Sequence, residues 1–261
     1  MSRPYLLFVA ATVVIGLFDT FATPQVRGDD SAADLIRRAA EFSAAGKSRE
    51  AVDAATRAIA LQPDAADAYY LRGREHFRLG EVKKSVADFE KLVELRPARK
   101  ASLWELGISY YYAGEHEKGA TLFELYQTYH DSDVENGVWR YLCMARTDGV
   151  EKARAELLPI QIDPRVPMSE IYDLYRGRTT PDDVLTAAKA GAPSPETLKP
   201  RLFYAHLYIG LHHEAAGRRE EAKPHIAKAA GKHRISHYMG DVAKVHQRII
   251  ADGAAKPGKS R

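Results

Sequence analysis

Hydrophobic residues along much of this chain recur at three- and four-residue steps, in segments that glycine and proline separate. In one such segment Val82, Val86, Phe89 and Leu92 fall on a single side of a helix. This spacing is typical of an amphipathic helix that buries one face. Because the same spacing returns after each break, the pattern predicts an all-α protein built from short helices.

A fixed period orders these helices. Three landmarks recur after 34 residues: Gly73 and Gly107, Gly80 and Gly114, and Pro63 and Pro97. A 34-residue period is typical of the tetratricopeptide repeat (TPR), whose unit is a pair of antiparallel helices. The first glycine lets the two backbones approach closely, the second occupies the turn between them, and the proline ends the second helix. The sequence therefore predicts a TPR superhelix, or solenoid, of helix-turn-helix repeats.

The landmarks also predict the organisation of the chain. We expect three TPR units over residues 32–132, a degenerate repeat and irregular helical connector over 133–200, a C-terminal TPR unit and capping helix over 201–251, and a disordered basic tail over 252–261. In the connector, Thr180 is expected to cap a short helix that begins at Pro181. The capping helix, from about Met239 to Ala251, is expected to cover the exposed end of the stack.

The first 28 residues have the layout of a secretory signal peptide. Arg3 precedes an uncharged apolar run from Tyr5 to Phe18, and small and polar residues follow through Gly28. As a helix this run would reach about 21 Å, which is short of the roughly 30 Å hydrocarbon core of a bilayer. We expect cleavage after Gly28, with Ala22 as a second candidate. The alternative is an uncleaved N-terminal membrane anchor. In both cases we expect the rest of the chain to be exported to the periplasm or the extracellular space.

The charge distribution argues against a nucleic-acid partner. The formal net charge is +3, but the first 28 residues contribute +1 and three cations among the last six residues contribute +3. The body between them therefore carries −1. Phosphate backbones require clustered lysine and arginine, and the body has no net surplus of positive charge for such a cluster.

Candidate chemistry is confined to ten histidines and one cysteine. His212 and His213 are adjacent, while His233 and His237 are four residues apart and are expected to share a helix face. No His-Glu-x-x-His spacing or nucleophile-base set accompanies them. We therefore predict no catalytic residue, metal, cofactor or small-molecule substrate. A metal-binding or hydrolytic enzyme that uses the C-terminal histidines is kept as an alternative. Cys143 is predicted to be a small buried residue in a helix seam.

In TPR solenoids the first helix of each unit lines an inner groove. The groove positions of the second and third units are Tyr70, Arg74, Phe77, Trp104, Ile108 and Tyr111. Aromatic residues and arginine are the anchors that protein interfaces favour, so we predict that these six residues bind a protein or peptide partner. The alternative is that some of them fill the seam between units, because core and groove positions are adjacent on a helix.

The segment from residue 170 to 246 resembles the C-terminal half of the NlpI-like TPR lipoproteins of bacterial envelopes. The residues that carry this resemblance are Glu170, Ile171, Tyr172, Tyr175, Gly177, Phe203, Tyr204, Tyr208, Gly210, Gly217, His237 and Tyr238. The resemblance implies a homodimeric adaptor that brings peptidoglycan hydrolases to an envelope protease or into hydrolase complexes. This chain departs from the family in having no cysteine after the apolar run, so lipid tethering is not expected.

Together these features predict an exported TPR adaptor that binds other proteins in its concave groove. A self-assembling structural protein is a second alternative, and the sequence leaves a homodimer open.

Overall fold

The computed structural model describes residues 30–255. Within this range the regular structure consists of thirteen α-helices and one 3₁₀-helix, without strands, which confirms the predicted all-α class. No helix among the described residues is long and apolar enough to cross a membrane. The expected signal peptide over 1–28 lies outside the described range. Residues 252–255 of the expected disordered tail instead continue the last helix.

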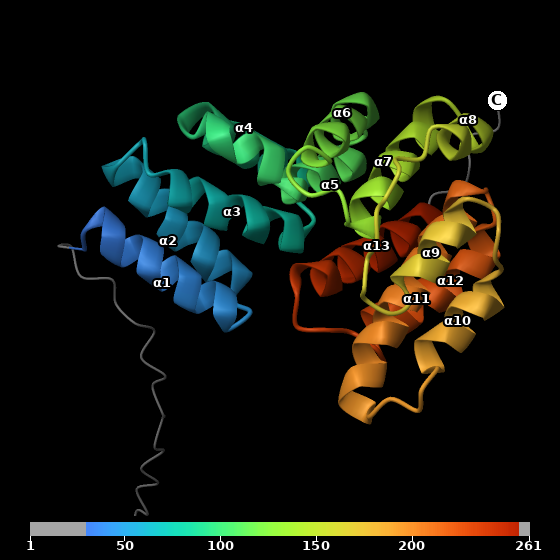
Figure 1. Ribbon diagram of the computed structural model, residues 1–261. Helices are drawn as coiled ribbons and strands as arrows, with labels where there is room; N and C mark the ends of the chain where they lie inside the picture. Colours follow the sequence, from blue (N-terminus) through green and yellow to red (C-terminus); the bar gives the residue numbers. More distant parts are fainter. Residues whose placement is uncertain (1–29, 256–261) are drawn as a thin grey trace, which may run out of the picture. The chain divides into compact units, whose positions relative to one another are not determined.

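Three helix pairs form the N-terminal part of the stack. They are α1 (Ala32–Ala44) with α2 (Ser48–Leu61), α3 (Ala66–Leu79) with α4 (Val82–Leu95), and α5 (Trp104–Ala113) with α6 (His116–Tyr126); the 3₁₀-helix η1 (Pro97–Ser102) precedes α5. Each helix packs on its neighbours in the chain, and α1 also contacts α3 (Figure 1). These contacts join successive pairs into a continuous stack.

The remaining helices are less regular in length. They are α7 (Val134–Thr147), α8 (Val150–Ala155), α9 (Met168–Tyr175), α10 (Pro181–Lys189), α11 (Pro195–Ala215), α12 (Arg219–Ala230) and α13 (Tyr238–Ala255). The Thr180 hydroxyl accepts a hydrogen bond from the Asp183 backbone N–H, and Pro181 occupies the first turn of α10, which confirms the predicted cap. Helix α7 packs against α6, α8, α9 and α11, so it connects the N-terminal pairs to the later helices.

In the second and third units, glycine at the eighth position lets an aromatic ring from the second helix lie on the backbone of the first. A Cβ atom added to Gly107 would meet Phe123 Cζ at 2.6 Å, which is closer than real contacts allow. The second glycine acts differently. Gly80 and Gly114 end α3 and α5 in the left-handed conformation, with φ of 82° and 81°, where a side chain would add strain. Both roles agree with the sequence prediction.

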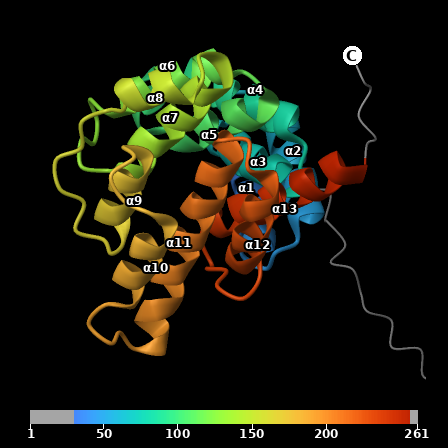
Figure 2. The ribbon, with the colours of Figure 1, turned by 90° about the vertical axis from the view of Figure 1, so that its right-hand side faces the viewer.

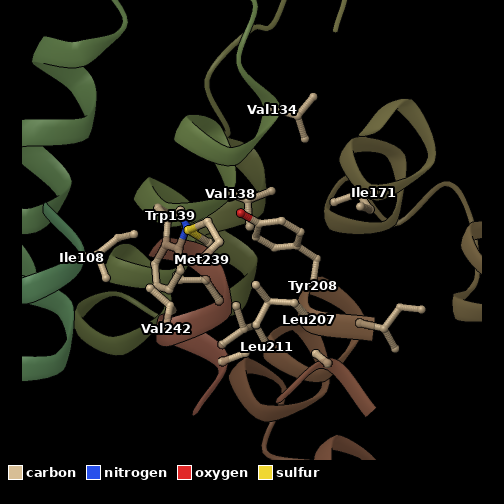
Figure 3. Packing of buried hydrophobic residues seen from close by; sticks show 14 of the residues in the cluster. Ile108, Val134, Val138, Trp139, Ile171, Leu207, Tyr208, Leu211, Met239 and Val242 are labelled. Atoms are coloured by element: carbon tan, nitrogen blue, oxygen red, sulfur yellow. The ribbon is translucent and has the colours of Figure 1, made fainter. Parts of the chain in front are cut away.

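The largest hydrophobic core lies mainly beyond the first two helix pairs. It extends from Phe77 and α5 through α7 to α13, and Figure 3 shows Trp139 and Met239 together within it. Cys143 belongs to this core, is fully buried and would meet a Cβ added to Gly119 at 2.8 Å. This placement confirms the prediction that Cys143 is a seam residue. Helices α1 and α2 contribute only small, alanine-rich clusters.

Helix α13 does more than cover the end of the stack. As expected, it packs on α12, the preceding helix. It also contacts α3, through an ion pair between residues 163 positions apart. Figures 1 and 2 show α13 alongside the earlier helices rather than beyond α12. The expectation that this helix only caps the end of the stack is therefore wrong. Side chains in its first turn are buried against the inner face of the repeats.

We predict that Gly107→Ala destabilises the protein, because the added methyl group forces Phe123 off the backbone of α5. Overpacking of this kind costs about 1–3 kcal/mol. Gly137→Ala is the matched control: it lies in α7, and the nearest atom that its Cβ would meet is in the Ile160 side chain, at an ordinary 3.4 Å. The control should be neutral or slightly stabilising, because alanine is the better helix former. Urea unfolding measures both changes, and equal effects would contradict the close-packing role.

Candidate functional site

Tyr238, the first residue of α13, occupies the inner face of the second and third repeats. Its ring stacks on Phe77 with centroids 5.3 Å apart and meets Trp104 edge-on, also at 5.3 Å. The Arg74 guanidinium lies over the same ring, 5.1 Å from its centroid. Tyr238 is only 1% exposed. Part of the chain thus fills the groove that was expected to receive a partner.

The six predicted groove residues divide into two sets. Phe77, Ile108 and Tyr111 are buried in the core, so the expectation that they line an open groove is wrong and the seam alternative applies to them. The reason is that α7 and α13 cover them. Tyr70, Arg74 and Trp104 are half-buried. Arg74 and Trp104 each line a space that α13 leaves open, whereas the Tyr70 hydroxyl donates to Glu105 at 2.8 Å.

Arg78 connects α13 to the first two helix pairs. Its Nε donates to Asp241 Oδ2 at 2.7 Å, and its Nη1 donates to Ser43 Oγ at 2.9 Å. The same guanidinium forms an ion pair with Glu75, which is fully buried. Arg248 in turn donates to the backbone carbonyl of Arg78. Because Arg78, Glu75 and Asp241 are largely shielded from water, their ion pairs hold α13 more strongly than surface ion pairs would.

A second polar group fixes the middle of α13. His246 Nε2 lies 2.7 Å from Glu214 Oε2, and the Tyr112 hydroxyl lies 3.0 Å from His246 Nδ1. Arg146 donates to Glu214 Oε1 at 2.8 Å and to the Tyr111 hydroxyl at 3.1 Å. Burial opposes ionisation of Glu214, but His246 and Arg146 outweigh it and lower the pKa of Glu214 to about 2. The carboxylate is therefore charged at neutral pH and holds α5, α7, α11 and α13 together.

A cleft of about 800 Å³ remains between α1, α3 and the segment 234–248. Its charged lining residues are Arg74, Arg78, Arg234, Lys244 and Arg248, with Asp241 as the one carboxylate. Asp241 pairs with both Arg78 and Arg234. The Nε atom of Arg74 is buried and has no hydrogen-bond partner. This basic cleft, defined by these six residues, is the candidate partner site on the inner face.

Sequence reasoning identified only Arg74 among the charged residues of the basic cleft. The other charged residues are brought together because α13 packs against α3. No local sequence pattern predicts this long-range contact. One signal was present in the sequence: Lys244 and Arg248 lie within the segment predicted to be the capping helix, and Arg234 lies shortly before it. The net charge of the body conceals this cluster, because a sum over the chain carries no information about position.

The C-terminal histidines do not form the predicted pair on a helix face. His233 and His237 lie in the loop between α12 and α13, because α12 ends before Gly231. Instead, His206 of α11 meets His225 of α12, with Nδ1 atoms 3.0 Å apart, and His233 stacks on His206 with centroids at 5.4 Å. Burial, then the neighbouring His225, lowers the pKa of His206 to about 3. No group of three or more metal-ligating side chains with suitable geometry occurs among the described residues.

Cys143 is similarly placed for packing rather than reaction. Burial raises the pKa of its thiol above the usual value, so the nucleophilic thiolate is disfavoured.

Antiparallel helix pairs stacked in chain order define an α-helical repeat protein. A family model for the tetratricopeptide repeat matches residues 36–99 and 70–133. The fold is similar to a tetratricopeptide repeat protein from Parabacteroides merdae, with 15% identity over 84% of each chain and a TM-score of 0.51. The chain therefore has the TPR helical repeat fold, and its residues 36–133 match the TPR family model.

Two further solved structures show weaker similarity. YrrB, described as a TPR protein with an unusual peptide-binding site, is 17% identical over 82% of this chain and 92% of its own, with a TM-score of 0.44. A thermophilic TPR protein of Thermus thermophilus is 17% identical over 85% of this chain and 99% of its own, with a TM-score of 0.43.

We predict that Tyr238→Ala destabilises the protein by about 3–5 kcal/mol, the usual range for deleting a buried aromatic ring. Ile249→Ala on the same helix is the control. Ile249 is 43% exposed, so its truncation should cost about 1 kcal/mol or less. Denaturant unfolding compares the two variants. Similar small losses would show that Tyr238 contributes little to the docking of α13.

We predict that protonation of His206 contributes to acid destabilisation. The unfolded histidine gains a proton near pH 6.5, whereas the folded imidazole, with a pKa of about 3, does not. The stabilising contribution of neutral His206 is therefore complete above pH 6.5 and is lost as the pH falls, by about 2 kcal/mol at pH 5. His206→Asn should remove this part of the pH dependence. Unfolding free energies of both proteins at pH 8 and pH 5 test this, and identical slopes would contradict it.

Proposed function

We propose that this protein is an exported, non-enzymatic adaptor that binds an extended acidic segment of a partner protein in the basic cleft. TPR domains bind proteins and peptides, so the class of partner follows from the fold. The observation that carries the proposal is the composition of the cleft, where five cationic side chains surround one carboxylate. A peptide with aspartate or glutamate would supply the missing negative charge.

The dimensions and polar groups of the basic cleft suit a peptide. Ligand-binding clefts commonly have volumes of roughly 300–1,000 Å³, and this one has about 800 Å³. Besides its charges, it is lined by Ser43, Ser48, Ser236 and Gln247. Hydroxyl and amide groups of this kind hydrogen-bond to peptide backbone groups. Arginine is well suited to the acidic side chains, because its planar guanidinium can bind both oxygens of a carboxylate.

The location and the kind of partner are further parts of this proposal. Export rests on the charged start and short apolar run of the first 28 residues. Partners among cell-envelope hydrolases or proteases rest on the resemblance of residues 170–246 to the NlpI-like proteins. Trp104 keeps a role at the inner face in this proposal, since it remains half-buried beside Tyr238.

We predict that a fluorescent peptide of alternating glutamate and glycine binds the protein more tightly than the same peptide with glutamine. The double variant Lys244→Glu and Arg248→Glu, which reverses two exposed cleft charges, should weaken this binding at least tenfold. Rising salt should weaken it as well, because exposed charges are screened. Fluorescence anisotropy measures the affinities.

Lys83→Glu is the control, because Lys83 is an exposed cation of α4 that does not line the basic cleft. Equal binding of the glutamate and glutamine peptides, or equal losses in the double variant and the control, would refute the cleft as the acidic-peptide site. The partner itself can then be sought with the mature chain as bait in envelope extract, with the double variant run beside it.

A further inference from the structure

A second pocket, of about 190 Å³, lies at the N-terminal end of α7. Its walls come from α5, α6 and α7, from the loop that contains Arg165, and from residues 237 and 239. His237 also lines the basic cleft, so the loop before α13 separates the two sites. We call this second site the aromatic pocket, after the four aromatic residues described next.

The aromatic residues of the pocket are Trp104, Phe123, Tyr126 and Trp139. Phe123 and Trp139 stack with centroids 6.5 Å apart, and Trp104 stacks on His237 at 6.3 Å. Aromatic faces carry negative electrostatic potential and attract cations that lie over them. Trp104 is half-buried, whereas Phe123, Tyr126 and Trp139 are buried. The pocket therefore offers several ring surfaces around a small space.

Two buried polar atoms of the pocket have no hydrogen-bond partner. They are the Oδ1 of Asn136, a residue 3% exposed, and the Nε1 of Trp139, a residue 2% exposed. The amide nitrogen of Asn136 is satisfied, since it donates to Gln127 Oε1 at 3.0 Å. An acceptor and a donor on two residues that line the pocket are therefore left without partners. Because unpaired buried polar groups are costly, the pair indicates a ligand that can both donate and accept.

Carboxylates outnumber cations at this site. One guanidinium, that of Arg165, bonds to Asp133 at 2.7 Å, to Glu135 at 2.7 Å and to Asp163 at 2.6 Å. Burial, then the charge of Asp133, raises the pKa of Glu135 to about 7. Three carboxylates share this one guanidinium, so Arg165 does not compensate the negative charge of the cluster in full. A second cation would complete the compensation.

We propose that the aromatic pocket binds a protonated alkylamine. The ammonium group would lie against the ring faces, donate to Asn136 Oδ1 and compensate the charge of Asp133 and Glu135. A carbonyl group of the ligand would accept from the Trp139 N–H. A lysine side chain in a peptide meets all of these requirements, and a free alkylamine meets all except the last. An anion would meet two carboxylates, and an uncharged apolar ligand would leave Asn136 and Trp139 unpaired.

The two tryptophans of the chain both line this pocket, so the test needs no added label. Nα-acetyl-lysine methylamide is titrated into the full protein while tryptophan fluorescence and the two indole N–H signals in ¹H–¹⁵N spectra are recorded. We expect saturable changes, with the Trp139 indole signal shifting on binding. The norleucine analogue, which has no ammonium group, should bind at least tenfold more weakly.

The source of the ammonium group is distinguished by a second ligand. n-Pentylamine has the alkyl chain and the charge but no carbonyl group. Tighter binding of the lysine derivative identifies a peptide side chain as the better ligand, while equal binding identifies a free amine. Either result supports an alkylammonium site, because both ligands share that group.

Two substitutions test the assigned residues. Glu135→Gln removes a charge and Asn136→Leu removes the unpaired acceptor, and each should weaken binding of the lysine derivative at least fivefold. Glu214→Gln is the matched control, because Glu214 is a carboxylate of similar exposure that also pairs with an arginine but does not line the pocket. Circular dichroism and thermal unfolding establish that each variant is folded before binding is compared.

The proposal fails if folded wild-type protein shows no saturable change with either amine, or if the norleucine analogue binds equally well. It also fails if the Glu135 and Asn136 variants, once folded, bind as the control does. The result is independent of the basic cleft, since the double variant Lys244→Glu and Arg248→Glu should bind the lysine derivative as the wild type does.

Discussion

The packing of Tyr238 against Phe77 and Trp104 is the interaction on which the arrangement of the inner face depends. Burial of this ring holds the start of α13 against the second and third repeats. The ion pair of Arg78 with Asp241 and the contact of His246 with Glu214 then fix the rest of the helix. With α13 in this position, the basic cleft and the aromatic pocket, which have opposite charge, lie on either side of the loop that leads into this helix.

The local architecture could be predicted from sequence because short-range rules determine it. Gly107 and Gly80 have their roles within a single helix pair, where the 34-residue period identifies close approaches and turns. The capping of α10 by Thr180 likewise depends on residues three positions apart. The position of Tyr238 follows no such rule, since its partners lie far away in the chain. The prediction that the six groove residues are open to a partner therefore assumed a repeat array whose inner face is not covered by α13.

The histidines illustrate the same limit on a smaller scale. Four-residue spacing indicates a shared helix face only if the helix continues, and α12 ends at Ala230, before His233. The contact of His206 with His225 joins two different helices, so no spacing within one helix predicts it. Asn136 and Trp139 lie in the segment 133–200 that was predicted to be a degenerate repeat and helical connector. Their unpaired polar atoms became apparent only in the packed structure.

The contact between α3 and α13 has a consequence for the order of folding. In an ordinary repeat array each unit contacts only its neighbours, so structure can propagate from one end as the chain appears. Here Arg78 and Asp241 are 163 residues apart, and contacts of such high sequence separation slow folding. The inner face of the second and third repeats must therefore stay uncovered until the last helix is available. During synthesis, the nascent repeats expose the aromatic surface that the folded protein buries, which makes this interval the period of greatest demand for chaperones.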